Sequence, residues 1–109
     1  MRQKGRHYEQ IALEYLITLG FELIEQNFHS RYGEIDLIMK KDSILHFIEV
    51  KSSHCMNPLA NITPKKLERL TKTIHVFLEQ RQISSHFCID AISIYKDNIM
   101  LIENITFGL

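Results

Sequence analysis

Residues 33–51 read GEIDLIMKKDSILHFIEVK and contain two strand-like runs joined by a polar turn. The runs, 34–40 and 44–51, are rich in aliphatic residues, and Lys-Asp-Ser at 41–43 suits the connection of a β-hairpin. The second run is apolar on both of its alternating faces, which is typical of an interior strand covered on both sides. We therefore expect a sheet that has this strand in its interior.

The rest of the chain supplies two helices and three further strands. The predicted elements are, in order, a helix over 5–19, strands over 21–28, 34–40 and 44–51, a helix over 64–81, and strands over 87–95 and 99–105. Thr63-Pro64 is a typical helix start, with a hydroxyl at the N-cap and proline at the first helical position. This order predicts one α/β domain over residues 1–109, a single sheet packed by helices.

Composition limits the function classes. Basic and acidic residues balance to a formal net charge of zero, which argues against a protein held to nucleic acid mainly by bulk charge. The polar N-terminus has no signal-peptide core, and no apolar run reaches the ~20 residues that span a membrane. We expect a cytoplasmic protein without membrane contact.

Cys55 and Cys88 are expected to be free thiols, and His54-Cys55 alone is a weak zinc pattern.

Alternation assigns the residues of the central runs to two faces. In the second run, one face carries Ile44, His46, Ile48 and Val50, and the other carries Leu45, Phe47, Glu49 and Lys51. In the first run, Ile35, Leu37 and Met39 oppose Glu34, Asp36 and Ile38. Asp36 therefore has apolar neighbours on both sides, and Glu49 and Lys51 share a face at the C-terminal end of their strand.

These three charges have two explanations. Burying an unpaired carboxylate costs several kcal/mol or shifts its pKa until it is neutral. In the first explanation, Lys51 neutralises an acid in a structural ion pair. In the second, Asp36 and Glu49 offer oxygens to Mg²⁺ or Mn²⁺, the backbone carbonyl of Val50 is a further ligand, and Lys51 faces the substrate.

Charged residues on the two helices add to the second explanation. Glu9 lies at the margin of the apolar stripe of the first helix, where it is either solvated or a third acid at the strand site. Lys65 and Lys66 lie in the first turn of the second helix and form a candidate phosphate-binding corner. Arg69 and Lys72 continue as a basic strip, or as an ordinary solvated face.

The order of these motifs resembles the PD-(D/E)xK nuclease superfamily, and more closely its YraN-like bacterial family. The matching features are G-x-x-x-E-x-x-A at 5–12, Asn27 before G-E-I-D-L-I at 33–38, E-V-K at 49–51, a Lys-rich helix start, and F-x-x-D at 87–90. The resemblance covers essentially the whole chain. It implies a mixed sheet flanked by helices, with an αβββαβ core of the restriction-endonuclease-like type.

The resemblance also implies roles for individual residues. Asp36 and Glu49 correspond to the metal-binding acids, and Glu9 to a helical acid that reaches the site directly or through water. Lys51 corresponds to the lysine that positions the attacking water or stabilises charge on the phosphate. The implied activity is Mg²⁺- or Mn²⁺-dependent hydrolysis of nucleic acid, DNA before RNA, including branched or damaged DNA, for which a homodimer would suit symmetric junctions.

The chain departs from the family pattern after E-V-K, where Ser52-Ser53 replaces the usual Thr-Arg. A phosphate contact is then missing or supplied from elsewhere, with Arg31 and Lys65 as candidates. The alternative function that follows is a nucleic-acid-binding or assembly module that keeps the nuclease fold without turnover. Because both acids and the lysine are present, the sequence favours the enzyme.

Overall fold

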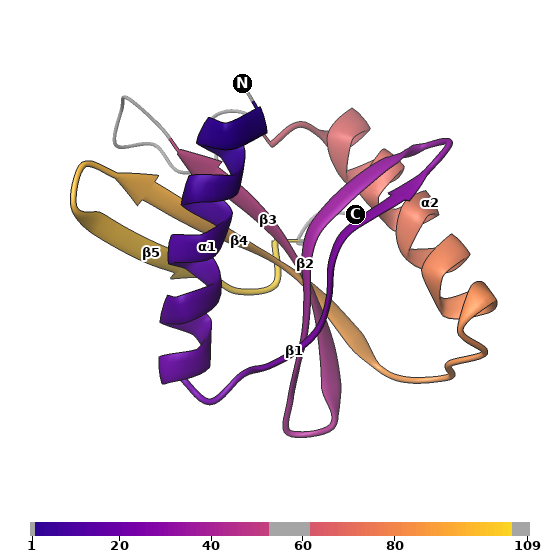
Figure 1. The fold of residues 1–109 in the computed structure, drawn as a ribbon. Coiled ribbons are helices and arrows are strands. Elements are labelled where there is room, and N and C mark those ends of the chain that lie inside the picture. Colours follow the sequence, from indigo (N-terminus) through magenta and orange to yellow (C-terminus); the bar gives the residue numbers. More distant parts are fainter. Residues whose placement is uncertain (1, 53–61, 106–109) are drawn as a thin grey trace.

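The computed structural model describes residues 2–52 and 62–105 (Figure 1). Its elements are α1 (Arg2–Thr18), β1 (Glu22–Ser30), β2 (Gly33–Lys41), β3 (Ile44–Ser52), α2 (Pro64–Gln80), β4 (Phe87–Tyr95) and β5 (Asn98–Ile102). The predicted order of helix, three strands, helix and two strands is confirmed. The predicted β2–β3 hairpin is confirmed, but its turn is one residue shorter than expected because Lys41 belongs to β2 and pairs with Ile44. Asp42 and Ser43 both lie in the left-handed region (φ 51° and 67°), as is typical of two-residue hairpin turns.

All five strands form one sheet in the order β1-β2-β3-β4-β5. Neighbouring strands are antiparallel except β3 and β4, which run parallel because α2 connects them as a crossover. The predicted mixed α/β sheet is confirmed, and the interior position predicted for β3 is also correct. The elements α1 to β4 give the αβββαβ order.

The helices cover opposite faces of the sheet (Figure 1). The α1 face buries Ala12, Leu13 and Leu16 against Leu37, Ile48 and Ile92. The α2 face buries Leu67, Leu70, Ile74 and Phe77 against Phe28, Ile38 and Phe47. Thr63 caps α2 as predicted, because its hydroxyl oxygen accepts a hydrogen bond from the Lys66 amide at 3.1 Å. Neither helix is long and apolar enough to cross a membrane, within the residues described.

The predicted face of Ile35 is wrong. Ile35 packs with Ile38 in the α2 core, whereas Leu37 and Met39 pack in the α1 core. Strict alternation therefore breaks at Asp36. On the paired strand β1, Asn27 lies between Gln26 and Phe28, which pair with Leu37 and Ile35, and it takes a left-handed conformation (φ 53°), which asparagine tolerates better than most residues. The irregular backbone of β1 thus lies beside the point where β2 changes the face of its apolar residues.

The last strand is shorter than predicted and ends at Ile102 instead of residue 105. Asn104 has a positive φ of 53° and turns the chain back over β4. Its amide donates to Asp90 Oδ1 at 2.8 Å, and the next amide, of Ile105, donates to the Ile89 carbonyl at 2.8 Å. Hydrogen bonds to β4 thus replace continued pairing of β5.

Predictions for the segment after β3 fall on residues 53–61 and lie outside the described residues. They include the weak zinc pattern at His54-Cys55 and the position of Ser53, where the family pattern has arginine. In the described part of the chain, Cys88 is a free thiol, as expected.

Candidate functional site

The site forms where β2 and β3 separate. Their pairing extends from Lys41↔Ile44 to Leu37↔Ile48 and no further. Beyond this point a side chain replaces the backbone hydrogen bonds between the two strands: the Oδ2 atom of Asp36 accepts a hydrogen bond from the Val50 amide at 2.8 Å. This bond fixes the Asp36 carboxyl at the end of β3. Val50 thus reaches Asp36 through its amide, and its carbonyl as a metal ligand stays a prediction.

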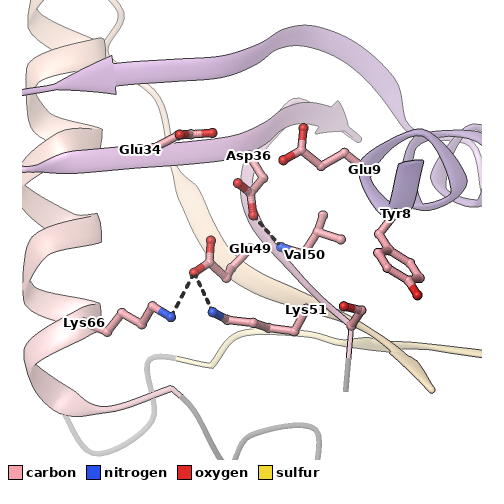
Figure 2. A pocket seen from close by; sticks show the side chains of 9 residues that line it. Tyr8, Glu9, Glu34, Asp36, Glu49, Val50, Lys51 and Lys66 are labelled. Atoms are coloured by element: carbon pink, nitrogen blue, oxygen red, sulfur yellow. Dashed lines mark hydrogen bonds and ion pairs between the residues drawn. The ribbon is translucent and has the colours of Figure 1, made fainter. Parts of the chain in front are cut away.

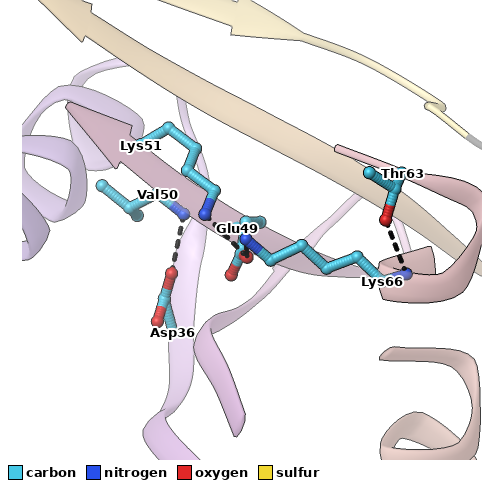
Figure 3. Close-up of polar contacts among 6 residues, drawn as sticks. All are labelled: Asp36, Glu49, Val50, Lys51, Thr63 and Lys66. Atoms are coloured by element: carbon cyan, nitrogen blue, oxygen red, sulfur yellow. Dashed lines mark hydrogen bonds and ion pairs between the residues drawn. The ribbon is translucent and has the colours of Figure 1, made fainter. Parts of the chain in front are cut away.

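Glu49 and two lysines lie beside this point. Glu49 is 9% exposed, and its Oε2 atom is 3.6 Å from the ammonium of Lys51 and 3.7 Å from that of Lys66. Figure 3 shows the two lysines approaching one carboxylate from different elements, Lys51 from β3 and Lys66 from the first turn of α2. The Lys51–Glu49 contact is the ion pair that one explanation of the central charges predicts.

Three acids converge on the other side of the pocket. One carboxylate oxygen from each of Glu9, Glu34 and Asp36 lies within 4.8 Å of the others. Glu9 comes from α1 and points toward Asp36, while Glu34 and Asp36 both come from β2 (Figure 2). The distance lets one ion touch all three carboxylates. The structure thus brings Glu9 and Asp36 together as predicted, and adds Glu34.

These groups line one open pocket of about 360 Å³. The lining residues are Tyr8, Glu9, Glu34, Asp36, Glu49, Val50, Lys51, Ser52 and Lys66. Sequence reasoning missed Glu34, Tyr8 and Ser52 as pocket residues. Glu34 was detectable, because it lies two residues before Asp36 and alternation places both on one face. Tyr8 resembles a residue of the apolar stripe of α1, so no signal separates it from the core.

The negative charges of the neighbouring acids disfavour the ionised form of Asp36. Burial, contact with Glu49 and the charge of Glu9 raise the pKa of the Asp36 carboxyl to about 9, and the Val50 amide only partly opposes them. Burial and the neighbouring Lys51 ammonium lower the pKa of Lys66, against the attraction of Glu49. Without a further cation, Asp36 is therefore protonated at neutral pH. A divalent ion would favour its charged form.

The basic residues predicted to bind nucleic acid separate into two places. Lys66 reaches the pocket, whereas Lys65 and Arg69 are exposed on α2. Arg31 and Lys72 meet elsewhere, over the ring of Tyr32 at 4.9 Å and 5.5 Å from its centre. Neither of them lines the carboxylate pocket.

Lys72 also pairs with Glu68 at 3.6 Å in an exposed i, i+4 ion pair, which fits the solvated-face alternative as well as nucleic-acid contact. The nucleic-acid roles of Arg31, Lys65, Arg69 and Lys72 stay predictions.

Comparison with known sequences places the chain in a family. The model of "Uncharacterised protein family UPF0102" matches residues 8–94. The chain belongs to UPF0102. All acids and lysines that line the pocket fall within the matched part, so the site lies in the segment that defines the family.

Three bacterial UPF0102 proteins show how far the similarity extends. One from Helicobacter pylori strain HPAG1 is 50% identical over 106 residues, which is 97% of this chain and 93% of the relative. A Helicobacter hepaticus protein is 48% identical over 105 residues, 96% of both chains. A Wolinella succinogenes protein is 43% identical over 105 residues, 96% of this chain and 97% of the relative. The expected family resemblance along essentially the whole chain is confirmed at the level of UPF0102.

Proposed function

We propose that this UPF0102 protein is a divalent-metal-dependent nuclease of the PD-(D/E)xK, restriction-endonuclease-like type. It would hydrolyse phosphodiester bonds in nucleic acid, DNA in preference to RNA, with branched and damaged DNA among its substrates. The observation that supports this most strongly is the convergence of Glu9, Glu34 and Asp36 beside Glu49 and Lys51 in one pocket. Acids from α1, β2 and β3 meet there although each would be more stable apart.

The pocket suits a hard divalent cation. Its donors are carboxylate oxygens, the ligands that Mg²⁺ and Mn²⁺ prefer. The raised pKa of Asp36, about 9, reflects its burial and then the charges of neighbouring acids, and a cation between the acids would relieve their repulsion. Glu9, Glu34 and Asp36 would hold the ion, with Glu49 as a fourth acid once it leaves its lysine partners.

Hydrolysis follows from these positions. A bound Mg²⁺ or Mn²⁺ ion would lower the pKa of the attacking water and would place positive charge beside a phosphate oxygen. The Val50 amide holds the Asp36 carboxylate in place, and Lys51 adds fixed positive charge where the phosphate becomes more negative. The water oxygen bonds to phosphorus and one P–O ester bond breaks. One proton of the water ends on the leaving oxygen, and the other is released to solvent or stays on the phosphate, so that the products are a phosphate monoester and a hydroxyl end.

A non-catalytic nucleic-acid-binding or assembly module is the second candidate. The observation that favours it is the pairing of Glu49 with both Lys51 and Lys66, which leaves this acid neutralised without a metal. The same pairing does not neutralise Asp36, whose carboxyl faces other acids. We therefore prefer the nuclease.

A cleavage panel tests the proposal. Single-stranded, duplex and branched DNA and RNA are incubated with Mg²⁺ or Mn²⁺ and the wild-type protein, Asp36→Ala, Lys51→Ala or Lys40→Ala. We expect the wild-type protein to cut at least one DNA form. Asp36→Ala and Lys51→Ala should each lower the rate of that cleavage by about 10³-fold or more. Lys40, an exposed lysine near the far end of β2, is the matched control and should keep activity. Cutting that survives in both site variants would reject this site, and a wild-type protein that cuts nothing would favour the binding module.

A further inference from the structure

The pocket has an acidic side and a basic side. Glu9, Glu34 and Asp36 gather on one side within 4.8 Å, whereas two ammonium groups lie on the other. Glu49 stands at the boundary, with Oε2 within 3.7 Å of both lysines. Figure 2 shows this division, with Lys51 and Lys66 pointing at Glu49 from the side away from Glu9. Such a pocket is matched to a cation and an anion bound side by side.

Lys66 is held in place by the start of its helix. Its amide donates to the Thr63 hydroxyl at 3.1 Å, which fixes the first turn of α2 (Figure 3). From there its side chain extends to the pocket, while its neighbour Lys65 is exposed. The first turn of a helix is unfavourable for cations. A lysine held there, next to Lys51, is poorly explained by helix stability.

Charge balance shows what the second lysine is suited to do. Two ammonium groups share one carboxylate, so this corner carries one net positive charge. A phosphodiester carries one negative charge and gains more during attack by water. A second ammonium at this position is therefore matched to charge that develops in the reaction, and such interactions raise turnover more than ground-state binding.

We propose that Lys66 is a second active-site lysine that contacts the scissile phosphate of nucleic acid. Glu49 then exchanges partners: it leaves Lys51 and Lys66 for the metal, and both ammonium groups turn to the phosphate. This inference rests on the proposed nuclease function and assigns Lys66 to turnover instead of to general attraction of the nucleic-acid backbone.

Three variants test the inference: Lys66→Met, Lys66→Arg and Lys65→Met. For each, kcat and KM are measured on the DNA form that the wild-type protein cuts best, and thermal melting checks folding. Calorimetry without DNA measures the affinity for Mn²⁺ alone, a result that does not depend on activity.

We expect Lys66→Met to lower kcat by about 10²-fold, and Lys66→Arg to recover part of that loss. Mn²⁺ should bind Lys66→Met about threefold to tenfold more tightly, because a cation that competes for Glu49 is gone. Lys65→Met should instead raise KM and weaken the salt dependence of binding while keeping kcat.

Wild-type cleavage with an unchanged kcat in Lys66→Met would overturn this inference and leave the proposed function standing. Mn²⁺ binding that is unchanged or weaker in Lys66→Met would overturn the partner exchange. A wild-type protein that cuts no substrate would overturn the proposed function, and the role of Lys66 in turnover with it.

Discussion

Two aspartates of this protein, the half-buried Asp36 and the buried Asp90, resemble each other in their first contact and differ in their second. Each accepts a hydrogen bond of 2.8 Å from a backbone amide, Asp36 from that of Val50 and Asp90 from that of Asn104. The other oxygen of Asp90 lies 2.6 Å from the Nδ1 atom of His46, in a pair that is almost fully buried. Asp36 instead faces Glu9, Glu34 and Glu49.

The difference separates an acid that supports the fold from an acid that, in the proposed function, binds a cation. Asp90 joins β3, β4 and the segment after β5, and its hydrogen bonds are complete within the protein. Asp36 is held in place by Val50, but its surroundings favour the neutral form. A protein gains no stability from gathering acids in this way, so their arrangement indicates a function.

Replacing each aspartate by asparagine should give opposite effects on stability. Asp90→Asn breaks the buried pair with His46 and should lower the free energy of unfolding by about 3 kcal/mol. Asp36→Asn resembles the protonated acid and should raise the melting temperature of the metal-free protein at pH 8. Denaturant and thermal unfolding of the two variants measure both effects. Equal destabilisation by the two changes would mean that Asp36 is a structural residue like Asp90.

A related effect should appear as a pH trend in the metal-free protein. The pKa of Asp36 is about 9 in the folded protein and has its ordinary value of 3.8 when exposed. The folded state therefore binds the proton more tightly, and the stability from Asp36 is full below pH 4 and lost as pH rises toward 9. We expect the melting temperature to fall between pH 5 and pH 8, and less steeply in Asp36→Asn.

Saturating Mn²⁺ should reverse most of this trend, because the ion binds the charged form. Since Lys66 and the other titrating groups remain in Asp36→Asn, the difference between the two proteins isolates Asp36. If the melting temperature depends on pH in the same way in the wild-type protein and in Asp36→Asn, the pKa of Asp36 is not raised in the folded protein.

The sequence predicted the fold well because its signals are local. Helical spacing and the two apolar faces of β3 reflect burial, and the Thr63-Pro64 start reflects an N-cap hydrogen bond; the structure confirms all three. It failed where a single backbone conformation matters. Ile35 changes face beside the left-handed Asn27, and β5 ends before the left-handed Asn104. Neither conformation follows from hydrophobic periodicity.

The site was predictable in part for the same reason. Asp36, Glu49 and Lys51 stand out as charges within apolar strands, and the structure brings them into one pocket with Glu9. Alternation places Glu34 on the face of Asp36, but it stands out less because a charge at the start of a strand is common. The meeting of Arg31 and Lys72 over Tyr32 depends on how the β1–β2 turn packs on α2, which one sequence does not reveal.

Calorimetric titration of Mn²⁺ into the metal-free protein tests most directly whether the acidic pocket is a cation site. The comparison uses the wild-type protein, Asp36→Asn, and Asp97→Asn as a control at an exposed turn. We predict saturable binding to the wild-type and control proteins, and its loss in Asp36→Asn although that variant folds. Undetectable binding to the wild-type protein, or equal binding to Asp36→Asn, would contradict the account.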